Sequence, residues 1–236
     1  MSPSRPGSAA PQPRLSLIYR RRTVESGTDD ELRPLLILLH GVGSNELSMS
    51  GLAPAFDPRC LVISVRSPIQ FAPFSFGWFH VTFTAHGPVI DGAEGEAAWT
   101  TLAAFIDEAV AGLGVDPGRV FLAGFSQGGI VALATLLTSP ERVAGAICMS
   151  GRLPPEVCAR IAAPERLRGK HVLIVHGTHD TTLDVEYGRR ASESLRRLPL
   201  SLTYREFDVG HAVSEEMLAA VSAWLTDRLD DSVSGS

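Results

Sequence analysis

Seven short apolar runs are spaced along the chain, and segments with helical periodicity separate them. The runs are LSLIY (15–19), LLILLH (35–40), CLVISV (60–65), RVFLAGF (119–125), GAICMS (145–150), HVLIVHG (171–177) and LTYREF (202–207). Several of them are continuously apolar, which is typical of parallel strands that are covered on both faces. The alternation predicts an α/β fold in which a mostly parallel central sheet of about seven strands carries helices on both faces.

Four segments between the runs have the apolar spacing of helices: 94–113, 128–138, 185–198 and 214–229. Asp91 and Glu94 form a candidate capping box before the first of them, and Ser214 is a candidate N-cap for the last. Because crossovers between parallel strands are right-handed, the carboxyl ends of the strands meet at one edge of the sheet, where ligands bind. Functional residues are therefore expected directly after the strands.

The length of 236 residues fits one α/β domain, because such folds often run to about 200–250 residues as a single unit. We assign this domain to residues 14–230. Residues 1–13 are rich in Pro, Ser and Ala and are predicted to form a disordered tail. Residues 231–236 are predicted to form a second, shorter tail.

The composition argues against several classes of function. A net charge of −5 argues against nucleic-acid binding, which needs a concentrated basic surface. No run approaches the ~18 apolar residues of a membrane span, and the N-terminus lacks the apolar region of a secretory signal. We therefore predict a cytoplasmic protein without stable membrane insertion. Cys60 and Cys148 lie in apolar runs and are predicted to be buried, inert thiols.

The string GFSQGG (124–129) contains the pattern Gly-x-Ser-x-Gly with Ser126 at its centre. It follows an apolar run and opens a helical segment, which is the strand–turn–helix context that a nucleophilic serine requires. Such a turn strains its central residue and brings the flanking residues together, so Gly124 and Gly128 stand where side chains would collide. Ser126 is expected to expose its hydroxyl at a helix N-terminus, where free N–H groups favour a developing negative charge.

A serine hydroxyl needs a neighbouring base to act as a nucleophile at neutral pH. His211 follows the last strand and Asp180 follows the strand before it, so both can reach Ser126 at the same sheet edge. The chain order Ser126, Asp180, His211 is that of an α/β-hydrolase triad. Asp184 and Asp208 also lie near strand ends, but Asp184 is expected to cap the following helix and Asp208 to order the histidine loop.

The fourth element is the loop after LLILLH, with the sequence His40-Gly41-Val42-Gly43. Its glycines let backbone N–H groups face an open space, and the tetrahedral intermediate of acyl transfer needs such donors for its oxyanion. We predict that the N–H of Val42 and the N–H of Gln127, in the serine turn, form an oxyanion hole. His40 is expected to fix the loop and to take no part in the chemistry.

Together, the strings LHGVGSNE, GFSQGG, HGTHD and GHAVSEEM resemble the phospholipase/carboxylesterase family of α/β-hydrolases, which includes the acyl-protein thioesterases. The resemblance covers roughly residues 33–228. It implies a compact serine hydrolase of α/β-hydrolase fold with little or no cap domain, with the triad and oxyanion residues at the positions named above. Family members often carry Val-Pro after the acidic residue. Here Leu183-Asp184 stands there, so the rim of the pocket is expected to differ.

Residues 66–93 form a long insertion that holds six aromatic side chains: Phe71, Phe74, Phe76, Trp78, Phe79 and Phe83. Its three prolines exclude a regular helix, and a long loop at this sheet edge is typically functional. The rings could form an apolar wall for an acyl chain or aromatic ester, or a satellite core that pins the segment to the body. We predict that the substrate contacts Gly43, Trp78, Phe79 and Leu183.

These features predict a serine hydrolase that cleaves carboxylic esters or thioesters of small molecules through an acyl-enzyme intermediate. No cofactor is expected, because the sequence holds neither GxGxxG nor a Walker lysine motif. His176 and His179 lack a well-spaced third partner beside Asp180, so no metal is expected either, and His176 is expected to anchor its loop. Three alternatives stay open: a non-catalytic binding protein of the same fold, a peptidase or amidase with the same triad, and a homodimer contact through the apolar loops.

Overall fold

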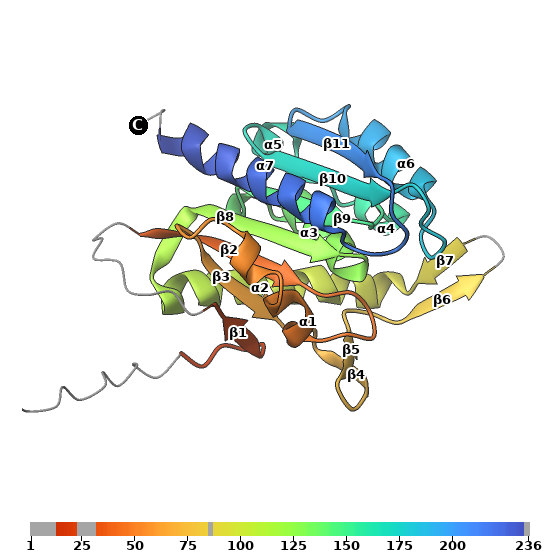
Figure 1. The fold of residues 1–236 in the computed structure, drawn as a ribbon, viewed down its shortest axis with the longest axis horizontal. Helices are drawn as coiled ribbons and strands as arrows, with labels where there is room; N and C mark the ends of the chain where they lie inside the picture. Colours follow the sequence, from red (N-terminus) through yellow and green to blue (C-terminus); the bar gives the residue numbers. More distant parts are fainter. Residues whose placement is uncertain (1–12, 23–31, 85–86, 234–236) are drawn as a thin grey trace, which may run out of the picture.

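A seven-stranded sheet runs through the centre of the molecule (Figure 1). Its strands are β1 Tyr19–Arg21, β2 Arg33–Leu39, β3 Leu61–Val65, β8 Val115–Phe125, β9 Gly145–Met149, β10 His171–Gly177 and β11 Ser201–Phe207. They lie in the order β1-β3-β2-β8-β9-β10-β11, and all neighbours pair in parallel except β1 with β3. The computed structural model describes residues 13–22, 32–84 and 87–233. The predicted, mostly parallel sheet is confirmed.

Helices cover both faces of this sheet. They are α1 Glu46–Ser50, α2 Gly92–Leu113, α3 Gln127–Thr138, α4 Pro155–Cys158, α5 Pro164–Leu167, α6 Val185–Leu195 and α7 Glu215–Val233, with short 3-10 turns η1 Ala53–Ala55 and η2 Pro140–Arg142. The helices α2, α3 and α6 contribute apolar side chains to one core. The elements α1, η1 and α7 contribute to a second core on the opposite face, and Figure 1 shows α7 lying across that face.

The continuously apolar runs follow from this layering. In β2, Leu35, Ile37 and Leu39 belong to the core on the α2 side, whereas Leu36 and Leu38 belong to the core on the α7 side. Successive residues of a strand point to opposite faces of the sheet. A strand between two helical layers therefore needs an apolar residue at every position, as the sequence indicated.

The segment between β3 and α2 is more regular than the loop expected from its sequence. It forms two antiparallel hairpins, in which β4 Ile69–Ala72 pairs with β5 Ser75–Gly77 and β6 Val81–Thr84 pairs with β7 Gly87–Ile90. Prolines exclude a helix but are tolerated in short edge strands, as Pro88 is in β7. These hairpins stay attached to the body, so the described residues contain no separate cap domain.

The ends of the chain and of α2 differ in detail from the prediction. Asp91 caps α2, but Glu94 leaves the capping box open because its carboxylate accepts the N–H of His80. The first strand begins at Tyr19 rather than at residue 15, since the preceding leucines pack on the core without joining the sheet. Ser214 caps α7 as predicted, its Oγ accepting an N–H of the first turn.

The predicted tails meet the structure only in part. Helix α7 continues to Val233, so the predicted C-terminal tail 231–236 begins inside this helix. Of the predicted N-terminal tail 1–13, only Pro13 belongs to the residues that the structure describes, and its carbonyl accepts the Tyr19 hydroxyl at 2.9 Å. The rest of that prediction lies outside the described residues.

Candidate active site

Ser126 lies at the sharp turn between β8 and α3, directly before the helix. Its φ is 52°, in the left-handed region that non-glycine residues rarely adopt, so the turn holds the serine in a strained conformation. A Cβ at Gly124 would lie 2.1 Å from the Gly128 carbonyl carbon, and a Cβ at Gly128 would lie 2.2 Å from the Leu39 oxygen. Close backbone contacts therefore require both glycines, as the motif predicted.

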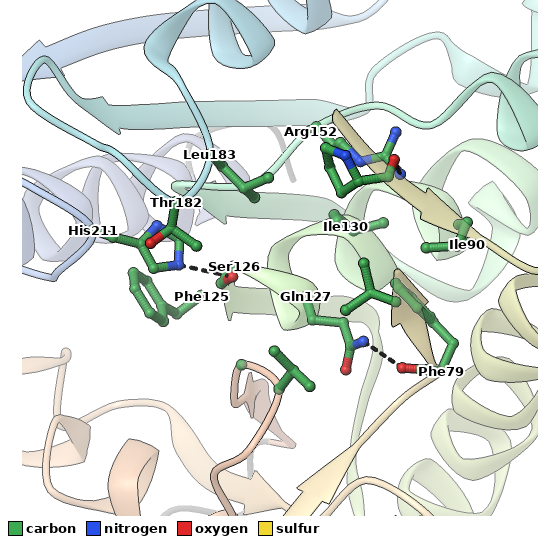
Figure 2. A pocket seen from close by; sticks show the side chains of 14 residues that line it. Phe79, Ile90, Phe125, Ser126, Gln127, Ile130, Arg152, Thr182, Leu183 and His211 are labelled. Carbon is green, nitrogen blue, oxygen red and sulfur yellow. Dashed lines mark hydrogen bonds between the residues drawn. The ribbon is translucent and has the colours of Figure 1, made fainter. Parts of the chain in front are cut away.

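Three polar side chains from different loops form one hydrogen-bonded chain at this turn. His211 Nε2 lies 3.0 Å from Ser126 Oγ, and His211 Nδ1 lies 2.6 Å from Asp180 Oδ2. In Figure 2, His211 lies to the left of Ser126, and a dashed line marks the bond between them. The Asp180 side chain is fully buried and that of His211 is 19% exposed, so the imidazole connects a buried carboxylate to the hydroxyl. The structure thus brings together the three residues that the sequence singled out.

The Asp180 carboxylate is held by its own loop. Its Oδ1 accepts the N–H of Thr182 at 2.9 Å and the N–H of Leu183 at 2.8 Å, and its Oδ2 is the atom that faces His211 Nδ1. His176 is fully buried, and its Nε2 lies 2.8 Å from Leu183 O and 3.4 Å from Asp180 Oδ2. His176 therefore anchors the loop, as expected from the sequence.

The two rival carboxylates have other partners. Asp184 caps α6, with its Oδ1 accepting the N–H of Glu186 at 2.8 Å. Asp208 is exposed and lies 2.6 Å from Nε2 of the exposed His179, so neither carboxylate is bonded to His211. Within the ranges that the structure describes, no group of three His, Cys, Asp or Glu side chains is arranged to hold a metal ion.

The loop after β2 lies against the serine turn. A Cβ at Gly41 would lie 3.3 Å from Ser126 Cβ, and Gly41, Val42 and Gln127 line the same pocket as Ser126. Among the residues that the structure describes, no acceptor is found for the backbone N–H of Val42 or of Gln127. Both donors therefore remain available at the pocket that Ser126 faces.

Two residues beside these donors have structural contacts. The Gly43 N–H donates to Phe76 O at 2.8 Å, which ties the loop to β5. His40 is fully buried; its Nδ1 lies 2.8 Å from Gly41 O, and its Nε2 accepts the N–H of Ser67 at 3.0 Å. Burial lowers the pKa of His40, which favours the neutral ring that these bonds require. His40 fixes the loop, as expected.

Ser126 and His211 open onto a pocket with a volume of about 240 Å³. Figure 2 shows Ser126 between His211 on one side and Arg152 with Ile90 on the other. Most of the lining is apolar and comprises Phe79, Val81, Pro88, Ile90, Ile130 and Leu183, with Arg152 among them. The pocket is therefore suited to an apolar group attached to a carbonyl carbon at Ser126.

The four residues predicted to contact the substrate divide into two pairs. Phe79 and Leu183 line the pocket, whereas Gly43 and Trp78 do not. Trp78 is 1% exposed, belongs to the core, and donates its indole N–H to His40 O at 3.3 Å. Its aromatic character reflects core packing, which corrects the prediction for this residue.

The remaining rings of the insertion contribute little to the pocket. Phe76 is buried beneath the Arg66 guanidinium, whereas Phe71 and Phe74 are exposed; the side chain of Phe83 is outside the described set. The wall is instead mainly aliphatic, because the β6–β7 hairpin supplies Val81, Pro88 and Ile90. The alternation Val-Thr-Phe-Thr over 81–84 is typical of a strand, but it does not indicate which face of that strand lines the pocket.

The side chain of Gln127 connects the serine turn to this wall. Its Oε1 accepts the N–H of Trp78 at 2.7 Å, and its Nε2 donates to Phe79 O at 2.7 Å, the second bond being drawn in Figure 2. Both bonds are buried. Gln127 therefore presents a backbone N–H to the pocket and fixes the pocket wall with its side chain, a contact that the sequence did not indicate.

Away from the site, the cysteines are as predicted. Cys60 and Cys148 are buried, and burial raises the pKa of each thiol to about 12, so neither is ionised at neutral pH. Cys158 is exposed. In the described part of the chain, no helix combines the length and the apolar character needed to cross a membrane.

A parallel sheet between helices, with a strained serine between β8 and α3 and a histidine and a carboxylate after later strands, defines the α/β-hydrolase class. The chain belongs to the phospholipase/carboxylesterase family, since the family model described as Phospholipase/Carboxylesterase matches residues 21–228. The match spans nearly all of the described chain, including every residue of the hydrogen-bonded chain at Ser126.

Several curated proteins are similar to this chain in sequence. Carboxylesterase SOBER1 of Arabidopsis thaliana is 30% identical over 216 residues, which cover 86% of this chain and 93% of that protein. The probable carboxylesterase SOBER1-like of the same plant is 32% identical, and the match spans about half of each chain, 56% of this one and 51% of that one. Acyl-protein thioesterase 1 of Mycosarcoma maydis is 29% identical, covering 68% of this chain and 75% of that protein.

One more sequence relative and one solved structure are also similar to this chain. A protein of Oryza sativa subsp. japonica named probable inactive carboxylesterase is 26% identical, over 80% of this chain and 82% of that protein. The crystal structure of esterase PE8 superimposes with a TM-score of 0.77 at 26% identity, covering 90% of this chain and 99% of that one. The fold is thus shared over the whole length of a solved esterase.

Proposed function

We propose that this protein is a serine hydrolase that cleaves carboxylic esters or thioesters through an acyl-enzyme on Ser126. The observation that carries the proposal is the hydrogen-bonded chain from Asp180 through His211 to Ser126 at the edge of an apolar pocket. The names of the relatives support carboxylic ester and thioester substrates. The modest pocket volume favours a small-molecule ester or a short acyl group.

In the first half of the reaction, Ser126 attacks the carbonyl carbon of the ester. His211 Nε2 takes the hydroxyl proton, since Asp180 accepts the Nδ1–H and so keeps the lone pair on Nε2. The buried carboxylate then stabilises the imidazolium that forms. The same imidazolium protonates the departing alcohol or thiol, which leaves the acyl group bonded to Ser126 Oγ.

In the second half, a water molecule replaces the alcohol or thiol. His211 takes a proton from that water, the resulting hydroxide attacks the acyl carbon, and His211 returns the proton to Ser126 Oγ as the acid leaves. In both halves the negative oxygen accepts hydrogen bonds from the N–H groups of Val42 and Gln127. The availability of both donors at the pocket and the N-terminus of α3 support this assignment.

The proposal is tested by Ser126→Ala on p-nitrophenyl acetate and butyrate, together with labelling by a fluorophosphonate probe. Turnover by the purified protein should fall by several orders of magnitude, to the residual ~10³–10⁴ over water that remains without a triad member. The probe should label the wild type at Ser126 and leave the variant unlabelled. A folded variant that keeps most of the turnover would overturn the assignment.

The same assays separate the alternatives that the sequence left open. A non-catalytic protein of this fold would neither turn over esters nor react with the probe, and the complete hydrogen-bonded chain argues against it. A peptidase or amidase would cleave p-nitroanilides at a rate comparable with the matched p-nitrophenyl esters. A cytoplasmic location and a homodimer remain predictions from the sequence.

A further inference from the structure

A buried arginine stands among the apolar residues at the end of the pocket remote from the triad. Arg152 follows β9 and is 7% exposed, and the pocket lining next to it includes Pro88, Ile90 and Ile130. Figure 2 shows Arg152 on the side of Ser126 that lies away from His211. The proposed hydrolysis uses no cation at this place, so it does not explain why a buried arginine lines the pocket.

The guanidinium has few partners in the protein. Within the part of the chain that the structure describes, it donates one hydrogen bond, from Nη2 to Pro88 O at 3.1 Å, and its buried Nε has no partner. Glu156 and Tyr187 attract the charge without forming an ion pair with it, and burial outweighs them and lowers the pKa of Arg152. Arginine nevertheless stays protonated in proteins, so an incompletely paired cation borders the pocket.

The charge indicates the chemistry of the missing partner. A buried charge is costly unless it is paired and hydrogen-bonded. The single hydrogen bond to a backbone carbonyl does not explain the charge, because a neutral side chain could donate that bond equally well. The planar guanidinium is the side chain best matched to a carboxylate, which it can bind through two parallel hydrogen bonds. An anionic group on the bound substrate would satisfy the donors that the protein leaves unused.

The position of Arg152 relative to His211 indicates which half of the substrate carries this anion. The imidazolium protonates the leaving alcohol or thiol, so that half of the ester must lie on the His211 side of Ser126. The acyl half then extends in the other direction, past Ile130 and Ile90 toward Arg152. The apolar residues between the two ends suit a chain of methylene groups.

We propose that Arg152 binds a carboxylate at the far end of the acyl group, so that the preferred substrates are half-esters or half-thioesters of dicarboxylic acids. This inference rests on the proposed function and specifies its substrate class. The reaction is unchanged: the ester bond is hydrolysed by one water, and the distal carboxylate takes no part in bond making or breaking. Arg152 is therefore a specificity-determining residue.

The test compares monoethyl adipate with ethyl hexanoate, which have six-carbon acyl chains ending in a carboxylate and a methyl group. The wild type should favour the half-ester in kcat/KM, and Arg152→Met should lower that preference roughly 10- to 100-fold, as expected for lost hydrogen bonds to a charge. Arg152→Lys should fall between, because it keeps the charge but loses the planar fork. The exposed Arg168 provides the control: Arg168→Met should leave the preference unchanged.

Inhibition gives a second readout that a purely structural role would not change. Free adipate should compete with substrate more strongly than hexanoate in the wild type, and this difference should vanish in Arg152→Met. If that variant does not fold, the Lys variant and inhibition of the wild type carry the test. A wild type with no preference for the half-ester and no stronger inhibition by adipate would overturn the proposal.

Two arms keep this result separate from the proposed function. Hydrolysis of ethyl hexanoate and fluorophosphonate labelling at Ser126 report on the hydrolase itself, whatever happens at Arg152. A third substrate, the butyrate ester of 4-hydroxybutanoate, places the carboxylate on the alcohol half. An Arg152-dependent preference for this substrate over monoethyl adipate would overturn the assignment of the acyl group to the Arg152 side.

Discussion

The two walls of the pocket are held in place by different kinds of contact. The catalytic wall comprises Ser126, Asp180, His211 and the loop that holds Val42. Its loops follow the ends of neighbouring parallel strands, and the registers that pair Leu39 with Gly124 and Gly177 with Phe207 place those ends side by side.

The specificity wall comprises Phe79 and the β6–β7 residues Val81, Pro88 and Ile90, and the side chain of Gln127 bonds it to the serine turn through the backbone of Trp78 and Phe79, between the two hairpins. The sheet therefore positions the catalytic residues, whereas hydrogen bonds of the Gln127 side chain help to position the wall of the pocket.

This difference predicts two kinds of mutant. Changes on the catalytic wall that remove a reacting group or crowd its backbone contacts should abolish turnover or folding. Changes on the specificity wall should alter KM and substrate preference while the chemistry survives.

The largest effect is expected at the acid of the catalytic wall. Asp180→Asn keeps the shape of the side chain but removes the charge that orients and stabilises the His211 ring. We expect kcat for a p-nitrophenyl ester to fall by roughly 10³- to 10⁴-fold, with little change in KM. Steady-state kinetics on the purified variant, with circular dichroism to verify folding, provide the measurement.

The rival carboxylates are the matched controls for this change. Asp184→Asn should keep its helix cap, because Asn caps as well as Asp, and kcat should stay within about threefold of the wild type. Asp208→Asn removes an exposed pair with His179 and should likewise have little effect. A loss in either control as large as that in Asp180→Asn would show that the acid has been misassigned.

The next largest effect is expected in the serine turn, on stability rather than on rate. A Cβ at Gly124 would lie 2.1 Å from backbone atoms of Gly128, which cannot move aside as a flexible side chain could. Gly124→Ala should therefore lower the free energy of unfolding by about 3 kcal/mol, the upper end of the usual range for overpacking. Chemical denaturation monitored by fluorescence measures this change.

Gly51 supplies the control for the same substitution. It ends α1 with an ordinary φ of −63°, and the nearest atom to an added Cβ, Ser48 O, lies at 3.5 Å. Gly51→Ala should change the free energy of unfolding by no more than about 0.5 kcal/mol. Equal losses in the two alanine variants would mean that the turn is no tighter than an exposed helix end.

The same division explains how much of the molecule could be predicted from sequence. The strands β2, β8, β9 and β10 and the residues Ser126, Asp180 and His211 could be found because each is specified locally, by an apolar run followed by a turn. Where β1 begins could not be found, since an edge strand of three residues depends on pairing with β3.

The specificity wall escaped prediction for a related reason. Trp78 and Phe79 are adjacent, equally aromatic and both part of the same core, yet only Phe79 also lines the pocket. Arg152 lies in a loop without any motif, and its hydrogen bond to Pro88 O joins segments that are 64 residues apart in the chain. Contacts between segments far apart in sequence leave no periodic signal.

A smaller effect is expected where the two walls meet. Gln127→Ala would leave the Trp78 N–H and the Phe79 carbonyl buried without their partner while keeping the backbone N–H of residue 127. We expect kcat/KM to fall about 10- to 30-fold, mainly through KM, because unpaired buried groups cost about 1–3 kcal/mol before the wall relaxes. Kinetics with esters of increasing acyl length provide the measurement.

Gln70 provides the control for the loss of kcat/KM that is expected in Gln127→Ala. Gln70 lies in the same insertion but is exposed, and its amide donates to Ala72 O at 3.3 Å. Gln70→Ala should leave both kcat and KM unchanged. If Gln127→Ala instead lowered kcat alone, with KM intact, its side chain would belong to the catalytic wall and not to the specificity wall.

The smallest effect is expected at Val42, although this residue is assigned to the oxyanion hole. The proposed donor is its backbone N–H, and its side chain is 40% exposed at the rim of the pocket. Val42→Ala should keep the donor and leave kcat within about threefold of the wild type, whereas loss of an oxyanion donor costs about 10²–10³ in kcat. Steady-state kinetics on a short ester distinguish the two cases. A loss of kcat near the larger figure, in a folded variant, would mean that the Val42 side chain positions the loop, and the catalytic wall would then depend on side-chain packing as the specificity wall does.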